Sequence, residues 1–322
     1  MATAVTCNGC DYNYFHYIQK FYDNTPNFVE YLQDHGVIPK SVVCEKCKLP
    51  CSIAQELNIF YCGRSVQRRV CNFSVSMFAG TFLGYTRLPP WEIALYVNHC
   101  LQNFYDFSPC KEFLEWPTRT LVNWHNFCFE VTLNWLYNQE SIGGPNIIVE
   151  IDQTFFLKIK YERFRKREPN QVWLFGGIER ESKKRLIIPL HKEGQDPSAK
   201  TLLPIIRKYI RKGSVVISDD WAAFQTLSRE GYVHKLVNDP NDRSVHKWTI
   251  ELQLKKLRNW SSRTGIQTEK FIHYFSGYLF LDTFQDNPYH QFFLEIAKLY
   301  KSKPLGSHSF SLTGLKKYPE EE

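Results

Sequence analysis

The sequence predicts a mixed α/β domain that follows a set of helices and a small cysteine-bearing module. Three observations predict this fold class. Residues 12–38 and 88–137 have helical patterns. Cysteines are concentrated in the short segment 42–82. After residue 146, strand-like segments come first and then alternate with helices, which is typical of a mixed sheet.

Length and composition exclude several classes of protein. A chain of 322 residues with 43% apolar and 16% aromatic residues has room for two or three domains with sizeable cores, and it is neither disordered nor collagen-like. No apolar run approaches the roughly 20 residues that span a bilayer, so no membrane association is expected. The first residues lack a basic start followed by an apolar core. We therefore expect a soluble intracellular protein.

The positive charge lies in the second half of the chain. The formal net charge is +7, with −2 over residues 1–146 and +9 over residues 147–322. A basic half indicates a polyanionic partner, nucleic acid ahead of an anionic membrane. An ordinary solvated basic surface is the competing interpretation.

The N-terminal part is expected to be helical. Residues 12–38 fit helices, with Pro26 near a helix start and Gly36 near a helix end. Three further helices are predicted at Trp91–Asn103, Pro109–Glu115 and Thr118–Tyr137. Such a trio can present a recognition helix to DNA, although plain packing of three helices explains the pattern as well. The cysteines within these three helical patterns are expected to be small buried residues: Cys100, Cys110 and Cys128.

The module between these helices has the ligands of a zinc site. A C-x-x-C pair followed by two more cysteines supplies four thiolates for one tetrahedral Zn²⁺: Cys44, Cys47, Cys62 and Cys71. The second half is spaced more loosely than a C-x-x-C pair, so Cys51 is a rival ligand. The Cys7/Cys10 pair has three readings: it binds a metal separately, completes this site, or has no role.

The second half of the chain begins after the linker-like Gly143-Gly144-Pro145. Five strands are expected, the second and third as an antiparallel pair: Ile147–Asp152, Val172–Ile178, Arg185–Leu190, Val215–Asp219 and His234–Asn238. Three helices are expected between and after them: Ser198–Ile210, a short one from Trp221, and one from about His246 to Trp260.

Two of these strands end in acids. Ile147–Asp152 and Val215–Asp219 are apolar strands whose terminal carboxylates are costly at a sheet edge unless a cation or hydrogen-bond donors offset them. If the strands are neighbours, the carboxylates meet, and Glu251 on the following helix can join them. Three converging carboxylates hold two Mg²⁺ ions for phosphoryl transfer.

Each acid also has a plainer explanation. Asp220 can cap a short helix, Glu251 can be a solvated helix residue, and Asp152 can end its strand in a turn. Strand alternation does not decide between Asp219 and Asp220. Glu150 shares a face with Asp152 and can serve as a supporting acid.

Five motifs follow one another in this half of the chain: Val149–Gln153, Val172–Arg180, Val216–Trp221, Gly231–His234 and His246 with Thr249–Glu251. In this order they resemble the motifs of the Merlin-type DDE transposases, the eukaryotic relatives of the ISXO-type insertion-sequence transposases. The resemblance covers residues 147–285 well and residues 28–137 more loosely.

The resemblance implies a ribonuclease-H-like catalytic fold with the triad Asp152, Asp219 and Glu251 binding two Mg²⁺, which Mn²⁺ can replace. It aligns the cysteines proposed as zinc ligands with an N-terminal zinc ribbon, and it gives His246 a supporting or DNA-contacting role. The sequence departs from the family at Gln153, Trp248 and 252–254. None of these departures removes a proposed metal ligand, but they leave open whether this copy is active.

Basic side chains near the acids indicate DNA contact. Six lie in one stretch after the first acid, interleaved with Tyr161 and Phe164: Lys158, Lys160, Arg163, Arg165, Lys166 and Arg167. Lys255 and Arg258 follow Glu251 on the same helix face. These groups are expected to bind phosphates, with a solvated loop as the competing interpretation of the stretch.

The predicted function is that of a Mg²⁺-dependent DNA transposase that cleaves element ends and joins them to target DNA. Double-stranded DNA is the partner, a dimer is expected, and a eukaryotic protein would act in the nucleus. The alternative is a domesticated, catalytically silent DNA-binding or regulatory protein. A ribonuclease acting on RNA–DNA hybrids is disfavoured by the zinc module.

The predicted segments follow from this organisation. They are an N-terminal helical segment (1–40), a zinc-ribbon-like module (41–83), a helical, helix-turn-helix-like DNA-binding region (84–142), a ribonuclease-H-like catalytic domain (146–300) and a flexible tail (301–322).

Overall fold

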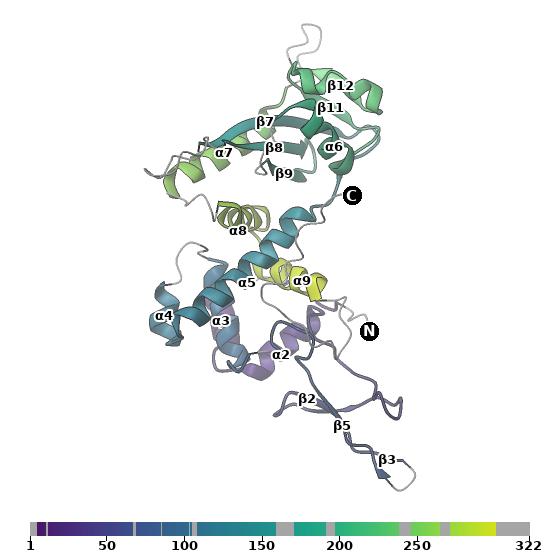
Figure 1. Ribbon diagram of the computed structural model, residues 1–322, viewed down its shortest axis with the longest axis vertical. Coiled ribbons are helices and arrows are strands. Elements are labelled where there is room, and N and C mark those ends of the chain that lie inside the picture. Colours follow the sequence, from purple (N-terminus) through teal and green to yellow (C-terminus); the bar gives the residue numbers. More distant parts are fainter. Residues whose placement is uncertain are drawn as a thin grey trace. The chain divides into compact units, whose positions relative to one another are not determined.

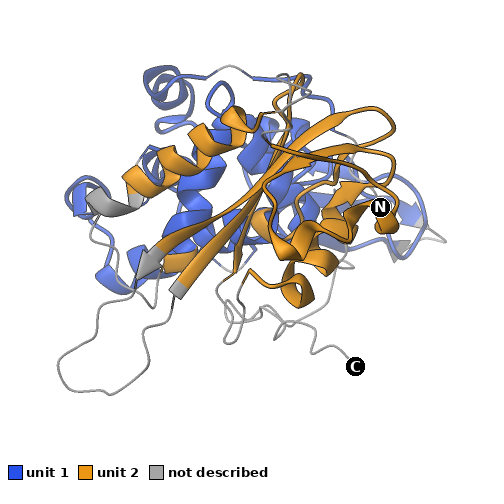
Figure 2. Cartoon of the chain, turned by 90° about the horizontal axis from the view of Figure 1, so that it is seen from above, with its two compact units in different colours: residues 1–135, 273–322 blue, residues 136–272 orange. Residues whose placement is uncertain are grey.

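The computed structural model describes most of the chain, and Figure 1 labels many of its helices and strands. The described residues are 5–10, 12–66, 69–84, 86–102, 104, 108–158, 171–190, 197–237, 246–264 and 271–300. The chain divides into two compact units (Figure 2): unit 1 comprises residues 1–135 and 273–322, and unit 2 comprises residues 136–272. In the described part of the chain, no helix combines the length and apolar character that a bilayer crossing requires.

Unit 1 is mainly helical. Its helices are α1 (Tyr14–Phe21), α2 (Thr25–Asp34), α3 (Pro90–Cys100), α4 (Ser108–Leu114), α5 (Thr118–Tyr137), α8 (Phe271–Thr283) and α9 (Pro288–Tyr300), with the ends of α5 and α8 crossing the unit boundary. The helical region predicted at 12–38 is broken at Asp23, whose φ is 48°. Asn24 then caps α2 by accepting a hydrogen bond from the Asn27 amide at 3.1 Å. Pro26 lies in the first turn of α2 and Gly36 just beyond its end, as predicted.

The three helices predicted between residues 91 and 137 are present as α3, α4 and α5. The cysteines expected to be buried within this region are buried: Cys100, Cys110 and Cys128.

The C-terminal helices pack with the N-terminal ones. Tyr17 of α1 stacks on Tyr289 of α9 with ring centroids 4.5 Å apart, and Tyr31 of α2 meets Phe293 edge-on at 5.1 Å. Aromatic contacts of this kind contribute beyond their buried area. Residues 273–300 therefore belong to unit 1 by their contacts, whereas the sequence pattern groups them with the catalytic domain. The other predicted segment boundaries stay predictions.

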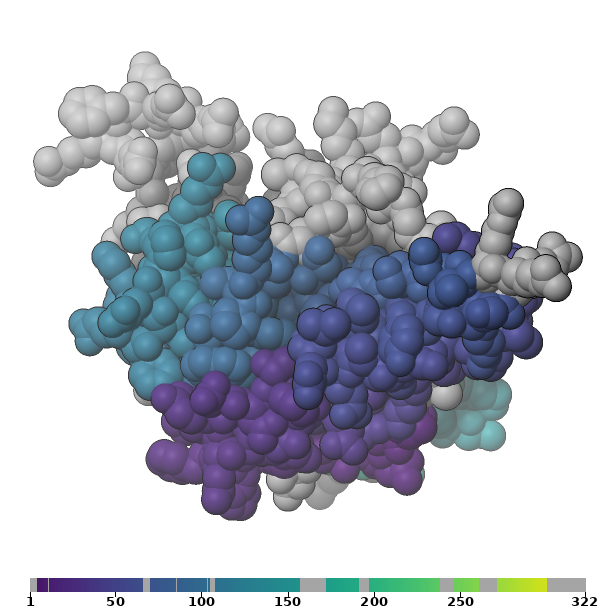
Figure 3. All heavy atoms as spheres, turned by 90° about the horizontal axis from the view of Figure 1, so that it is seen from below, coloured from purple at the N-terminus to yellow at the C-terminus, as the bar shows by residue number. Residues whose placement is uncertain are grey.

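The cysteine-bearing module of unit 1 consists of short strands. Strands β1 (Ser52–Ala54), β2 (Ile59–Cys62) and β5 (Phe73–Ser76) form an antiparallel sheet in the order β1-β2-β5. Strands β3 (Ser65–Val66) and β4 (Arg69–Val70), which lie between β2 and β5 in the sequence, form a separate antiparallel pair. On the face of the molecule seen in Figure 3, residues from α1 (purple) through the module to α5 (blue to teal) form most of the coloured surface.

Unit 2 is built on a mixed five-stranded sheet, as predicted. Its strands are β7 (Ile148–Lys158), β8 (Gln171–Glu179), β9 (Arg185–Leu190), β11 (Val215–Ser218) and β12 (Val233–Leu236), in the order β12-β11-β7-β8-β9. The β7–β8 and β8–β9 pairs are antiparallel, and β11 runs parallel to both β7 and β12. Strand β7, which contains Asp152, and strand β11, which Asp219 follows, are therefore neighbours. The sequence predicts that the first of these strands ends at Asp152, but β7 continues to Lys158, so this acid lies within the strand and not at its end.

Shorter elements complete unit 2. They are the parallel pair β6 (Ile142–Gly143) and β10 (Ile210–Arg211), the helices α6 (Ala199–Tyr209) and α7 (Trp248–Thr264), and the 3₁₀ turns η1 (Ala222–Phe224) and η2 (Leu227–Glu230). The helix predicted from Trp221 is thus a 3₁₀ turn, and that predicted from His246 begins two residues later.

Side chains alternate along β7 between two faces of the sheet, and the two faces have different surroundings. Val149 and Ile151 join the core formed with Leu202 and Ile206 of α6. Glu150, Asp152 and Phe156 alternate with them and face the side on which α7 packs. The strand therefore contributes a hydrophobic core on one side and an acid-bearing surface on the other.

Side chains of helix α7 pack directly on Gly176 of β8. A Cβ atom on this residue would lie 2.7 Å from Ile250 Cδ1 and 3.2 Å from Leu254 Cδ2. Gly176 pairs directly with Asp152 across the β7–β8 ladder. The absence of a side chain at this position therefore sets how near α7 lies to the first acid.

Gly176→Ala should lower the free energy of unfolding by about 1–3 kcal/mol, because the added methyl group overpacks the α7 interface. Chemical denaturation measures this difference. Gly177→Ala is the matched control on the same strand, since its nearest contact would be 3.2 Å from the Ile142 side chain. An equal or larger loss for Gly177→Ala would contradict the proposed tight contact at Gly176.

Candidate functional site

Three acids meet around one lysine in unit 2. Asp152 lies on β7, Asp219 directly follows β11, and Glu251 is in the first turn of α7. The Lys247 ammonium lies 2.8 Å from Asp152 Oδ1 and 3.7 Å from Glu251 Oε1, and it also donates a hydrogen bond to Asp219 Oδ2. Because both distances are measured to the same atom, the Asp152 and Glu251 oxygens lie within about 6.5 Å of each other.

The lysine and the first acid are the buried members of this group. The side chains of Lys247 and Asp152 are 7% and 13% exposed, whereas those of Asp219 and Glu251 are about half exposed. Burial raises the pKa of Asp152 above its usual value. Burial alone would lower the pKa of Lys247, but hydrogen bonds to Asp152 and Asp219 raise it. The group therefore combines three acids with one ammonium at a partly open surface.

The strand register decides between Asp219 and Asp220. Ile217 of β11 pairs with Glu150 of β7, so Asp219, two residues further on, lies on the same face as Asp152. Asp220 follows on the opposite face, and its carboxylate accepts a hydrogen bond from the side-chain amide of Gln225 at 3.5 Å. Asp219 is thus the acid that joins the cluster.

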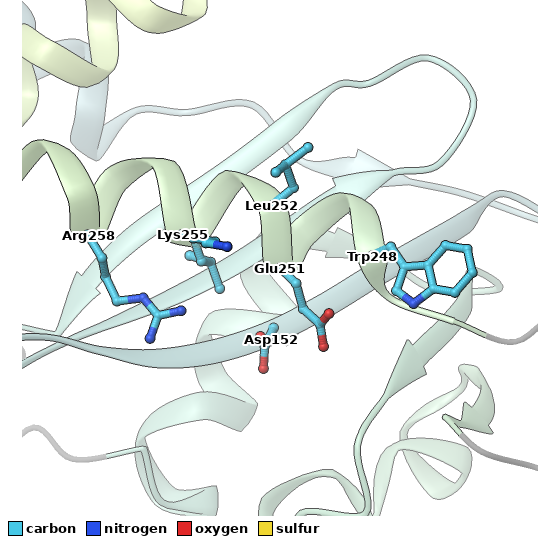
Figure 4. A pocket seen from close by; sticks show the side chains of 7 residues that line it. Asp152, Trp248, Glu251, Leu252, Lys255 and Arg258 are labelled. Atoms are coloured by element: carbon cyan, nitrogen blue, oxygen red, sulfur yellow. The ribbon is translucent and has the colours of Figure 1, made fainter.

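A pocket of about 440 Å³ opens beside the acids. Its lining comes from β7 and α7: Asp152, Trp248, Glu251, Leu252, Leu254, Lys255 and Arg258. Figure 4 shows Glu251 extending from α7 toward Asp152, with Trp248 and Arg258 on either side. Trp248 is 71% exposed. Lys255 and Arg258 share this wall with Glu251, as their helical spacing predicted.

Glu150 anchors the start of α7 to the sheet. This fully buried carboxylate accepts hydrogen bonds from the amides of Thr249 at 2.9 Å and Ile250 at 3.2 Å. Arg180 of the loop after β8 pairs with it at 2.9 Å. Negative charge at a helix N-terminus is favourable, and here it fixes the turn that carries Glu251.

His246 belongs to this anchor. Its Nδ1 atom lies 3.8 Å from Glu150 Oε1, its carbonyl oxygen accepts a hydrogen bond from Arg180, and its ring stacks on Trp248 with centroids 4.4 Å apart. It is not among the residues that line the pocket described above. Its predicted contact with DNA stays a prediction.

The basic stretch predicted to contact DNA lies almost entirely outside the described residues. Only Lys158 falls within them, as the last residue of β7.

The four cysteines predicted as zinc ligands come together in unit 1. The Sγ atoms of Cys44, Cys47, Cys62 and Cys71 all lie within 4.8 Å of one another, with Cys44–Cys71 and Cys47–Cys62 both at 3.5 Å. Four thiol groups at such distances have the composition and spacing of a structural zinc site. Cys51 packs against the cluster but is not one of its four members.

Sequence reasoning missed Lys247 and Arg180. Lys247 stands four residues before Glu251, a spacing that brings two side chains together on a helix, but it precedes the first helical residue. Arg180 is the last residue of the motif Val172–Arg180, but the sequence assigned it no role. In both cases the acids that accept the hydrogen bonds lie far away in sequence: Asp152 and Asp219 for Lys247, and Glu150 for Arg180.

Glu150→Ala should lower the free energy of unfolding by about 3–5 kcal/mol, because it leaves the Arg180 guanidinium and two helix amides without their buried acceptor. Urea denaturation followed by circular dichroism measures the change. Glu230→Ala, which removes the partner of the exposed Arg207 on the surface of the same unit, is the control and should change stability little. A small effect at Glu150 would show that the anchor does not stabilise the domain.

Comparison with known proteins agrees with this geometry. Residues 143–285 match the family model of the ISXO2-like transposase domain. Male abnormal protein mab-31 from Caenorhabditis elegans is 20% identical over 274 residues, which cover 75% of this chain and 62% of that protein. The chain thus spans less than two thirds of this relative's length.

Among solved structures, one match is a chain from the cryoEM structure of the simian T-cell lymphotropic virus intasome in complex with PP2A regulatory subunit B56 gamma. The identity is 12%, the match covers 67% of this chain and 79% of that chain, and the TM-score of 0.27 is too low to support a structural conclusion. The family match covers all three converging acids and the strands that hold two of them. Residues 143–285, which make up less than half of the chain, are thus similar to the ISXO2-like transposase domain.

Proposed function

We propose that this protein is a metal-dependent DNA transposase that cleaves DNA at element ends and joins the freed 3′-hydroxyl to target DNA. The observation that carries the proposal is the convergence of Asp152, Asp219 and Glu251 on one cation, the Lys247 ammonium, within a transposase-family domain. Cleavage and joining are both in-line attacks on phosphorus, so one such site can serve both steps.

The donor set fits a hard divalent cation. Carboxylate oxygens are the protein ligands that Mg²⁺ prefers, and three of them already surround a positive charge beside an open pocket. Asp152, Asp219 and Glu251 would hold two Mg²⁺ ions, with Mn²⁺ as a substitute. When bound, the metals would activate the attacking hydroxyl group and stabilise charge on the leaving oxygen.

The remaining residues of the site would hold the acids in position and contact the DNA. The Lys247 ammonium offsets repulsion among the acids and holds them together. Glu150 and Arg180 fix the start of α7 and thereby the position of Glu251. Lys255 and Arg258, on the same wall, would bind phosphates. The exposed Trp248 indole offers a face on which an unpaired base can stack.

We infer a ribonuclease-H-like fold for this catalytic domain. Three antiparallel strands are followed by two parallel strands added beside the first, which brings Asp152 within β7 close to Asp219 directly after β11. The following helix then supplies the third acid. This arrangement supports the fold that the family resemblance implies.

We infer supporting roles for unit 1. The cluster of Cys44, Cys47, Cys62 and Cys71 would bind a structural zinc ion in a zinc-ribbon-like module too small to bury a core of its own. Helices α3, α4 and α5 would contribute to recognition of element ends. Bringing two ends together requires at least two active sites, so a dimer is proposed, and the nucleus is proposed as its location in a eukaryotic cell.

A second candidate function is a domesticated DNA-binding or regulatory protein that keeps the fold without catalysis. The departures from the family pattern at Trp248 and Leu252, both on the pocket wall, favour this alternative. The intact acid cluster favours the enzyme.

Asp152→Asn, Asp219→Asn and Glu251→Gln should each reduce Mg²⁺-dependent nicking and strand transfer on element-end DNA by at least about 100-fold, because each removes a negatively charged metal ligand. Gel assays of both products measure the loss. Asp220→Asn is the matched control, since its carboxylate lies outside the cluster, and it should retain activity within a few-fold.

The two candidate functions give different results in this assay. Specific binding of the unmutated protein to element-end DNA, with no product in Mg²⁺ or Mn²⁺, would support the regulator and contradict the enzyme. Equal activity of the three acid variants and the unmutated protein would exclude this site as the catalytic centre.

Lys255→Ala and Arg258→Ala should each weaken DNA binding and reduce the slope of log Kobs against log[salt] by about 1, because each removes one phosphate contact. Binding titrations over a range of salt concentrations measure the slope. Arg229→Ala, an exposed arginine outside the pocket, should leave the slope unchanged. Equal slopes for all three variants would remove the α7 basic residues from the DNA interface.

A further inference from the structure

A second group of metal-binding side chains lies in unit 1. Cys7 and Cys10 come from the segment before α1, His35 follows the last residue of α2, and His290 is in the first turn of α9. One ligand atom of each lies within 4.8 Å of the others. Two thiols and two imidazoles are a common ligand set of structural zinc.

The measured distances match the edges of a zinc coordination tetrahedron. Zn–S bonds of about 2.3 Å and Zn–N bonds of about 2.0 Å place neighbouring ligand atoms roughly 3.3–3.8 Å apart. Cys10 Sγ lies 3.4 Å from His35 Nε2, and His35 Nε2 lies 3.1 Å from His290 Nδ1. The ligand atoms are therefore already near the separations that an ion would impose.

Neighbouring groups orient the ligands toward a common point. His35 Nδ1 lies 2.7 Å from the Tyr31 carbonyl oxygen and donates its proton there, which directs the lone pair of Nε2 toward His290 and Cys10. The Tyr31 hydroxyl group lies 3.4 Å from Cys10 Sγ and can donate to a thiolate. Backbone carbonyl and hydroxyl partners of this kind are typical of the surroundings of protein zinc sites.

Backbone contacts hold the cysteine pair beside the histidines. The amides of Thr6 and Cys7 donate to the carbonyl oxygen of Asp34, the residue before His35, at 2.9 and 3.1 Å. Gly9, with φ of 129°, allows the chain to turn between the two cysteines. The histidines are almost fully buried, with 1% of His35 and 7% of His290 exposed. The position of the pair is thus fixed by contacts that do not involve the thiols.

We propose that Cys7, Cys10, His35 and His290 bind a second structural zinc ion, separate from the four-cysteine cluster. The ion would join the N-terminal segment and α2 to α9, whose histidine is 255 residues away from His35. A metal crosslink between such distant segments restricts the unfolded chain strongly and so stabilises the folded unit. It would act together with the Tyr17–Tyr289 stack, which joins α1 to α9.

Zinc content and zinc K-edge EXAFS of the full-length protein, purified after expression with added Zn²⁺, test the proposal. The unmutated protein should contain two zinc ions per chain, with an average shell of three sulfurs and one nitrogen. The double variant Cys7→Ser/Cys10→Ser should keep one ion with four sulfurs. The matched variant Cys44→Ser/Cys47→Ser should keep one ion with two sulfurs and two nitrogens. Cys51→Ser should keep both ions.

A ligand exchange separates zinc binding from loss of folding. His290→Cys should keep two ions and raise the average sulfur count above three, because the new thiolate takes the place of the imidazole. One zinc ion per chain in the unmutated protein, in an all-sulfur shell, would overturn the proposal. An unchanged zinc content in Cys7→Ser/Cys10→Ser would also overturn it, as would a Cys7–Cys10 disulfide found by mass spectrometry of the unmutated protein. In either case a hydrogen bond between the two imidazoles would explain the contact between His35 and His290.

Discussion

The repulsion among like charges is the constraint around which unit 2 is built. Asp152, Asp219 and Glu251 repel one another when they are brought together, and the buried Lys247 ammonium offsets this cost. The lysine can do so only if α7 begins at the right height above the sheet. Glu150 fixes the distance between the start of α7 and the sheet by accepting hydrogen bonds from the first amides of the helix. Gly176 has no side chain and so leaves room for the α7 side chains that pack on β8. The charge cluster, the helix anchor and the missing side chain are thus parts of one arrangement.

Much of this unit could be predicted from the sequence because its signals are local. The two apolar strands, their acids and the position of Glu251 follow from residue order, although β7 continues past Asp152 to Lys158. The choice between Asp219 and Asp220 required the pairing of Ile217 with Glu150, which is a property of two strands and not of either alone. Lys247 was missed for a related reason, since a lysine before a helix is usually solvated and the two acids that accept its hydrogen bonds lie 28 and 95 residues away.

Unit 1 shows where local patterns give less information. The four-cysteine cluster was predictable, because two of its members share a C-x-x-C motif and the others follow within a short module. The Cys7/Cys10 pair has the same spacing, yet its two histidine neighbours lie far apart in the chain, His35 directly after α2 and His290 in α9. Nothing in the spacing of His35 and His290 relates them to each other. Only the packing of α9 against α1 and α2, through large aromatic side chains, brings them together.

Helix α8 links the family domain to the rest of the protein. The family match extends to residue 285, but most of α8 belongs by its contacts to unit 1. Ser276 of α8 hydrogen-bonds to Thr132 of α5 at 2.9 Å, and Gly277 lies so close to Phe104 that a Cβ atom would be 2.8 Å from its ring. A fragment ending at residue 285 and lacking α5 would leave this buried surface of α8 without its partners. The segment that matches the family model therefore shares a helix with unit 1, and its chemistry is best assigned from the behaviour of the whole chain.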